Sequence, residues 1–222
     1  MKTKINFLLI CLLLSIMETN LFAAENNDEN HTYIIGHWNY PDNSVNPIYV
    51  ISNGEDVELF INGISTGHGR QDSKYLFTFD NINFQPGTLT AVSYDKEGNE
   101  IGQYSLITSG VPAQLNLQVL NSPEKNPSAD PEEIVVQCKI MDFYGRRCFQ
   151  DNRTVTIEIE DSGDLSNSPV EPVNKCVRKK QLPLHNGVNS FSIKKPAKSG
   201  EIKLTAKAQG MAPAYLTVNS SK

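Results

Sequence analysis

The sequence is poor in the residue groups from which metal and nucleophilic centres are built. It has one tryptophan, four histidines and four cysteines in 222 residues. No Cys-x-x-Cys or His-x-x-x-His pair supplies the closely spaced ligands of a structural zinc site. The histidines are scattered along the chain, at His31, His37, His68 and His185. The sequence therefore predicts no metal ion, no cofactor and no catalytic triad.

Positive charge is also scarce. The formal net charge is −5 at pH 7, whereas nucleic-acid binding needs a clustered basic face. The one basic cluster, Arg178-Lys179-Lys180 with Lys175 nearby, is typical of a solvated strand or loop edge. Nucleic acid is therefore not expected as a partner.

Long apolar runs are missing after the N-terminus. The run from Phe7 to Leu14 is shorter than the roughly 20 residues that cross a bilayer, so no transmembrane span is expected. It follows Lys2 and Lys4 and precedes the small pair Ala23-Ala24, the order of a secretory signal. We expect residues 1–24 to be a signal peptide, and the rest to be secreted, periplasmic or displayed on the cell surface.

Helical periodicity over ten residues or more is absent after residue 24, and strand patterns replace it. Short runs rich in β-branched and aromatic residues are typical of strands. They cover Pro47 to Ser52, Val57 to Asn62, Tyr75 to Phe79, Leu89 to Tyr94 and Ile101 to Thr108. Asn62-Gly63 between two apolar pairs indicates a two-residue hairpin turn. The fold class is therefore predicted as all-β.

Alternation of apolar and polar residues becomes clearer after Pro112. It is seen from Leu115 to Val119, from Val155 to Ile159 and from Ile202 to Ala206, and it indicates antiparallel sheets with one wet face. The pattern restarts after Gly110-Val111-Pro112. We therefore predict two tandem immunoglobulin-like β-sandwiches, covering residues 25–112 and 113–222.

Four segments in a fixed order resemble a known family. They are His37-Trp38-Asn39-Tyr40, Val57 to Gly63, Gln85 to Val92 and Thr108 to Pro112. This order resembles the C-terminal accessory β-sandwich of bacterial family 2 glycoside hydrolases of the β-galactosidase type. The second sandwich resembles the immunoglobulin- or invasin-like domain that follows it. The catalytic glutamates of that family lie in its barrel, so the resemblance implies no catalytic residue in this chain.

Trp38 and Tyr40 are the candidate carbohydrate-binding residues. They lie two residues apart, so in an extended segment both rings share one face and, if exposed, form a platform for a sugar ring. If buried, the same pair anchors the first strand to the core, which is the interpretation we favour. The acidic residues Glu58, Glu158 and Glu160 are predicted to point to solvent.

Cys138, Cys148 and Cys176 remain once Cys11 is assigned to the signal segment, and one pair among them could close as a disulfide in an oxidising compartment. The alternation of Cys138 with Val136 and Ile140 also fits a small buried residue. Three functions stay open: a non-catalytic accessory module that binds a glycan, a hydrolase or a surface protein; a component or truncated form of a β-galactosidase-like hydrolase; and an adhesin-like spacer.

Overall fold

The structure is a computed structural model that describes residues 31–120, 133–161, 177–194 and 200–220. The predicted signal segment 1–24 and Cys176 lie outside these ranges. Among the described residues the regular elements are β-strands, and every named pair is antiparallel. The prediction of an all-β fold is therefore confirmed.

The strands before residue 110 form two four-stranded sheets, ordered β1-β2-β6-β5 and β4-β3-β7-β8. We call these sheets the N-terminal sheet pair. Their bounds are β1 Thr32–Ile34, β2 Val45–Ser52, β3 Asp56–Ile61, β4 Ile64–His68, β5 Arg70–Ser73, β6 Leu76–Asn83, β7 Thr88–Tyr94 and β8 Glu100–Ile107. One buried cluster joins residues of both sheets, among them Val50, Leu59 and Phe77, so the two layers pack face to face.

The remaining strands form a three-stranded sheet, β13-β10-β9, and a four-stranded sheet, β12-β11-β14-β15. We call them the C-terminal sheet pair. Their bounds are β9 Pro112–Val119, β10 Glu133–Asp142, β11 Thr154–Asp161, β12 Val177–Pro183, β13 Val188–Lys194, β14 Gly200–Lys207 and β15 Ala214–Ser220. A second buried cluster joins Val136 and Cys138 to Ile157 and Leu204 of the facing sheet.

Alternation predicted the buried faces correctly. In β10 every second residue is buried, from Ile134 through Cys138 to Asp142, and Val155 and Ile157 of β11 are fully buried. The Asn62-Gly63 hairpin is confirmed as well, because both residues have positive φ (52° and 81°) and Ile61 pairs with Ile64. These features follow from local sequence, since side chains alternate between faces along any strand.

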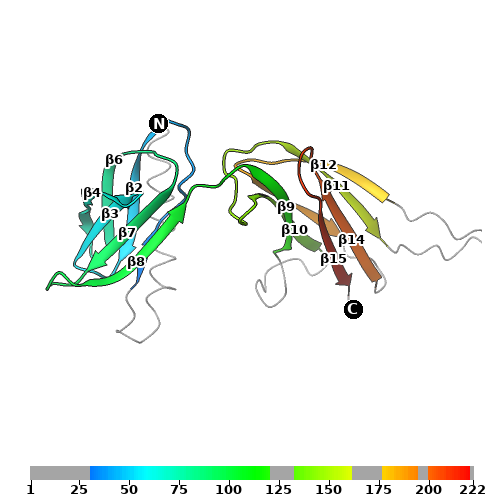
Figure 1. Cartoon of the computed structure of the whole chain (residues 1–222). Helices are drawn as coiled ribbons and strands as arrows, with labels where there is room; N and C mark the ends of the chain where they lie inside the picture. Colours follow the sequence, from blue (N-terminus) through cyan, green and yellow to red (C-terminus); the bar gives the residue numbers. More distant parts are fainter. Residues whose placement is uncertain (1–30, 121–132, 162–176, 195–199, 221–222) are drawn as a thin grey trace, which may run out of the picture.

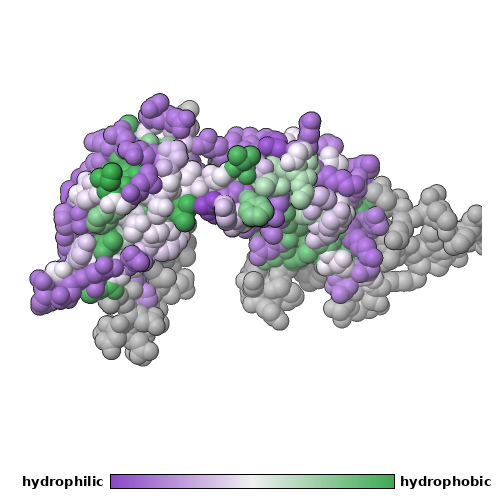
Figure 2. Space-filling model, in the orientation of Figure 1, coloured by the Kyte–Doolittle hydropathy of each residue, from purple (hydrophilic) through white to green (hydrophobic). Residues whose placement is uncertain are grey.

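Figure 1 shows the two sheet pairs as separate bodies connected through the stretch between β8 and β9. Figure 2 shows that the visible surface is largely hydrophilic, with strongly apolar residues in separate spots. In the described part of the chain, no helix combines the length and apolar character that crossing a bilayer requires.

Candidate functional site

Trp38, one of the two candidate carbohydrate-binding residues, lies in the N-terminal core and is 1% exposed. Its indole N–H donates to the Gln85 carbonyl (3.0 Å), and its ring packs edge-on against Phe84 at 4.9 Å between centroids. Tyr40 is partly buried against the same cluster, and burial raises its pKa. The Trp38 ring therefore has no exposed face for a sugar, and it occupies the position of a core anchor.

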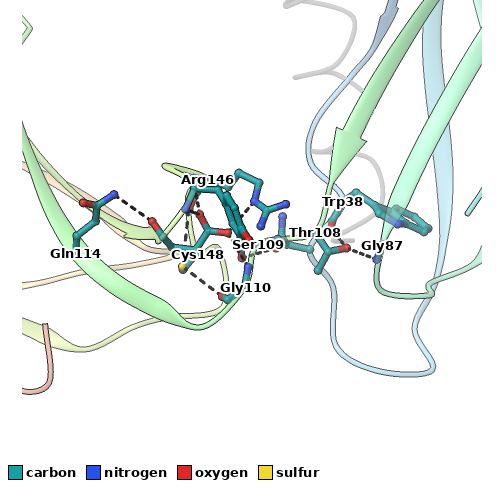
Figure 3. Close-up of polar contacts among 11 residues, drawn as sticks. Trp38, Gly87, Thr108, Ser109, Gly110, Gln114, Arg146 and Cys148 are labelled. Atoms are coloured by element: carbon teal, nitrogen blue, oxygen red, sulfur yellow. Dashed lines mark hydrogen bonds and ion pairs between the residues drawn. The ribbon is translucent and has the colours of Figure 1, made fainter.

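The connection between the sheet pairs is held by polar contacts from both sides (Figure 3). The Asn39 side-chain oxygen accepts hydrogen bonds from Ser109 N (2.8 Å) and Ser109 Oγ (2.7 Å). One residue later, Gly110 N donates to Asp142 Oδ2 (2.8 Å). Adjacent residues of the connection are thus bound to opposite sheet pairs, which restricts the backbone between them.

Aromatic and amide contacts reinforce this junction. The His37 ring stacks on Phe149 with centroids 4.1 Å apart, and the Gln150 amide donates to the Tyr40 carbonyl. The Arg147 guanidinium lies 4.1 Å from the Phe149 ring centroid, which is within the range of a cation–π contact. Burial, and then the charge of Arg147, lower the pKa of His37, which favours the neutral form of its imidazole.

A pocket of about 480 Å³ opens at the same junction. Its lining residues are Asn39, Thr108, Ser109, Gly110, Pro112, Cys148, Gln150, Asp151, Asn152 and Arg153. Arg153 is bound within the pocket wall, to Asp151 (2.7 Å) and to the Gln209 carbonyl (3.0 Å). Burial raises the pKa of the Cys148 thiol, which keeps it protonated and a poor nucleophile. This lining suits a polar ligand better than covalent chemistry.

A second hollow of about 530 Å³ lies over β3, β4 and the β7–β8 turn and includes Asp56, Glu58, His68 and Tyr94. His68 Nδ1 lies 2.6 Å from Asp56 Oδ2, and Tyr94 donates to Glu58 (3.3 Å). Burial, followed by the charge of Glu58, raises the pKa of Tyr94. The polar side chains of this second hollow therefore bind mainly to one another.

Residues 63–67 of this region spell Gly-x-Ser-x-Gly, the sequence of a nucleophile elbow. An elbow needs a turn from a strand into a helix, but Ser65 lies inside strand β4. Its hydroxyl donates to Glu58, and not to the neighbouring His68. Across the described ranges, no group of three or more His, Cys, Asp or Glu residues is placed to hold a metal ion.

Cys138 and Cys148 are both free and buried, so the structure contains no disulfide between these two members of the predicted set. Burial raises the pKa of Cys138 to about 11. The third member, Cys176, is outside the described ranges. The phase of Cys138 with Val136 and Ile140 is confirmed, because all three are fully buried.

The most exposed aromatic pair was not among the predicted site residues. Phe143 is 81% exposed and Tyr144 78%, at the turn that follows β10. They lie in the predicted second sandwich, residues 113–222. The local signal was available, since two aromatic residues between an aspartate and a glycine at a strand end are typical of a turn tip and not of a core.

Taken together, the described residues form an all-β scaffold of two sheet pairs, with two open hollows and an exposed aromatic turn after β10. Residues 43–102 match a family described as "Domain of unknown function (DUF4982)". A β-glucuronidase of Formosa agariphila is 25% identical over 197 residues, which cover 86% of this chain and 20% of that enzyme. The β-galactosidase BoGH2A of Bacteroides ovatus is 24% identical, covering 91% of this chain and 24% of that enzyme.

A solved structure of a family 2 β-glucuronidase superimposes with a TM-score of 0.65 at 25% identity, over 87% of this chain and 20% of that one. A second family 2 structure, from Bacteroides cellulosilyticus, has a TM-score of 0.61 at 22% identity and supports the fold. The chain spans about a fifth to a quarter of the length of the relatives that it matches. The predicted resemblance to accessory β-sandwiches of family 2 glycoside hydrolases is thus confirmed.

Proposed function

We propose that this chain is an exported, non-catalytic accessory module of glycan breakdown, which binds carbohydrate without cleaving it. The observation that carries the proposal is the coverage of the match. Nearly the whole chain corresponds to about a fifth to a quarter of each glycosidase, and that part folds as paired β-sheets.

The geometry of the described hollows supports binding over cleavage. Glycosidases hold two carboxyl groups about 5 to 9.5 Å apart across an enclosed sugar site, with the acid's pKa raised. Asp56 and Glu58 in the hollow over β3 and β4 are partly exposed, and they are bonded to His68, Ser65 and Tyr94. Such groups suit water or sugar hydroxyls as partners, not the activation of a glycosidic bond.

The choice of carbohydrate follows from the relatives. Their names identify a β-glucuronidase and a β-galactosidase, so glucuronides and galactosides are the first glycosides to test. The predicted signal at residues 1–24 provides the export step, which brings the module to the glycans outside the cytoplasm.

The deciding experiment measures hydrolysis and binding on the same preparation of the full chain, exported by its host. We expect no turnover of p-nitrophenyl β-glucuronide or β-galactoside above buffer, and retention of at least one glycan on an array. Glu58→Gln and Ser65→Ala are the matched variants. Turnover that either substitution abolishes would show an enzyme, and a silent array would remove the binding role.

Export has its own measurement. The proposal predicts that the chain leaves the cytoplasm and that deletion of residues 2–23 retains it there, as read by cell fractionation and immunoblotting. Equal distribution of both forms would contradict export.

A further inference from the structure

The turn after β10 is built on a single buried carboxylate. Asp142 is 1% exposed, and its two oxygens accept from Gly110 N (2.8 Å), Tyr144 N (2.9 Å), Arg146 N (2.8 Å) and Arg146 Nε (2.7 Å). Charge-assisted bonds of this kind are short and strong. The carboxylate therefore fixes the backbone of residues 142–146 and attaches it to Gly110.

The backbone of this turn is closed by further bonds. Asp142 N donates to the Arg146 carbonyl (2.8 Å), and Gly145 N donates to the Asp142 carbonyl (3.1 Å). Gly145 has a φ of 77°, a conformation that glycine adopts without steric cost. The result is a rigid support for two aromatic side chains that have almost no cover of their own.

The exposed surface of this turn is formed by two aromatic rings. The rings of Phe143 and Tyr144 are nearly perpendicular, at 88°, and their centroids are 5.6 Å apart. The Arg146 guanidinium lies 4.8 Å from the Tyr144 ring centroid, so it covers one face of that ring. Val111, another exposed apolar residue, follows Gly110 directly and so lies beside the base of the turn.

We propose that Phe143, Tyr144 and Arg146 form a sugar-binding platform, on which a pyranose ring stacks while its hydroxyl or carboxylate group meets Arg146. This rests on the proposed function and assigns its glycan contact to one turn. The apolar C–H face of a sugar ring matches an aromatic surface, and its polar rim matches a guanidinium donor. The buried Asp142 holds the support in place before the ligand arrives, which reduces the ordering cost of binding.

The contact area that the two rings offer favours a sugar over a protein as the ligand. Each aromatic side chain offers at most about 150 to 250 Å², so the pair provides well under the roughly 800 Å² per partner of a stable protein interface.

Affinity electrophoresis tests the platform. The full chain, exported by its host, runs through native gels that contain galactan, xylan, polygalacturonate or hyaluronan. We expect slowed migration in at least one gel, and an apparent Kd that the double variant Phe143→Ala/Tyr144→Ala weakens by about tenfold or more. Tyr215→Ala is the matched control, because Tyr215 is 73% exposed on strand β15 and lies outside the turn.

The outcomes divide cleanly. Slowed migration that the double variant loses and Tyr215→Ala keeps supports the platform, and comparison of acidic with neutral gels tells whether a carboxylate contributes. Equal migration of the double variant and the wild type overturns it, as does free migration in all four gels. A glycan array that stays positive for the double variant would sink the platform alone, whereas a silent array sinks the proposed function too. Because both rings are exposed, an unchanged melting temperature confirms that the double variant folds.

Discussion

The two sheet pairs bury different kinds of side chain. The N-terminal core contains Trp38 and three phenylalanines, Phe77, Phe79 and Phe84. The C-terminal core is built from aliphatic residues, with two thiols and one phenylalanine, Phe191. Large aromatic rings give a core a few dominant contacts, whereas aliphatic layers spread the same burial over many small ones.

This difference separates positions that a sequence motif can identify from those that it cannot. The motif around Trp38 is recognisable because a single ring must fit one space, with its N–H bonded to Gln85. The aliphatic layers accept substitutions of similar volume, so their sequence is recognisable only as alternation. The family match covers residues 43–102, which lie inside the N-terminal sheet pair but after the Trp38 segment.

The largest expected effect is that of Trp38→Ala. Removal of a fully buried indole costs about 4 kcal/mol of unfolding free energy. If each sheet pair folds separately, as the sequence predicts, calorimetry should resolve two transitions and only one should move. Leu204→Ala, at a buried position of the C-terminal pair, is the control and should move the other by about 3 kcal/mol. A common shift of both transitions would show that the two cores unfold together.

Asp142→Asn tests the junction between the two pairs. An amide cannot accept all four N–H bonds or balance Arg146, so we expect a loss of about 3 kcal/mol at pH 7, measured by urea unfolding. Burial alone raises the pKa of Asp142, but bonds from Gly110 and Arg146 outweigh it and leave that pKa below its ordinary value of 3.8.

The unfolding free energy lost in Asp142→Asn should depend on pH in one direction. A carboxyl group whose pKa is lower in the folded than in the unfolded state contributes its full stabilisation above the unfolded-state pKa. It loses that contribution as the pH falls through the folded-state pKa. The wild type and Asp142→Asn should therefore differ most above the ordinary carboxyl pKa of 3.8 and approach each other as the pH falls below it. A difference that stays constant between pH 7 and pH 3 would exclude the carboxylate as its source.

The smallest effect concerns thiol reactivity, which reports on the C-terminal pair alone. Cys138 and Cys148 are buried with raised pKa values, so in a Cys176→Ser background neither should react with Ellman's reagent at pH 8 until the chain is unfolded. Trp38→Ala should leave the slow rate unchanged, since no cysteine lies in residues 31–110. Fast reaction of either thiol in the native chain would contradict its burial.

The turn after β10 and the Trp38 segment illustrate the limits of prediction. Both contain two aromatic residues in a short stretch, but one pair is exposed and the other lies in or against a core. The Trp38 segment faces Phe84 from a distant strand end, a contact that spacing alone does not specify. Phe143 and Tyr144 project from a turn whose support comes from Gly110, more than thirty residues earlier.

The sequence by itself determined the all-β class, the buried faces of the clearly alternating strands and the Asn62-Gly63 turn, because alternation and positive φ are local properties of the chain. It also indicated the resemblance to family 2 glycoside hydrolases, through landmarks in a fixed order. Only the tertiary structure decided which aromatic rings reach solvent and which carboxylate holds the junction. Those outcomes depend on contacts between residues far apart in the chain, such as Asn39 with Ser109 and Gly110 with Asp142, and packing selects these contacts after the strands have formed.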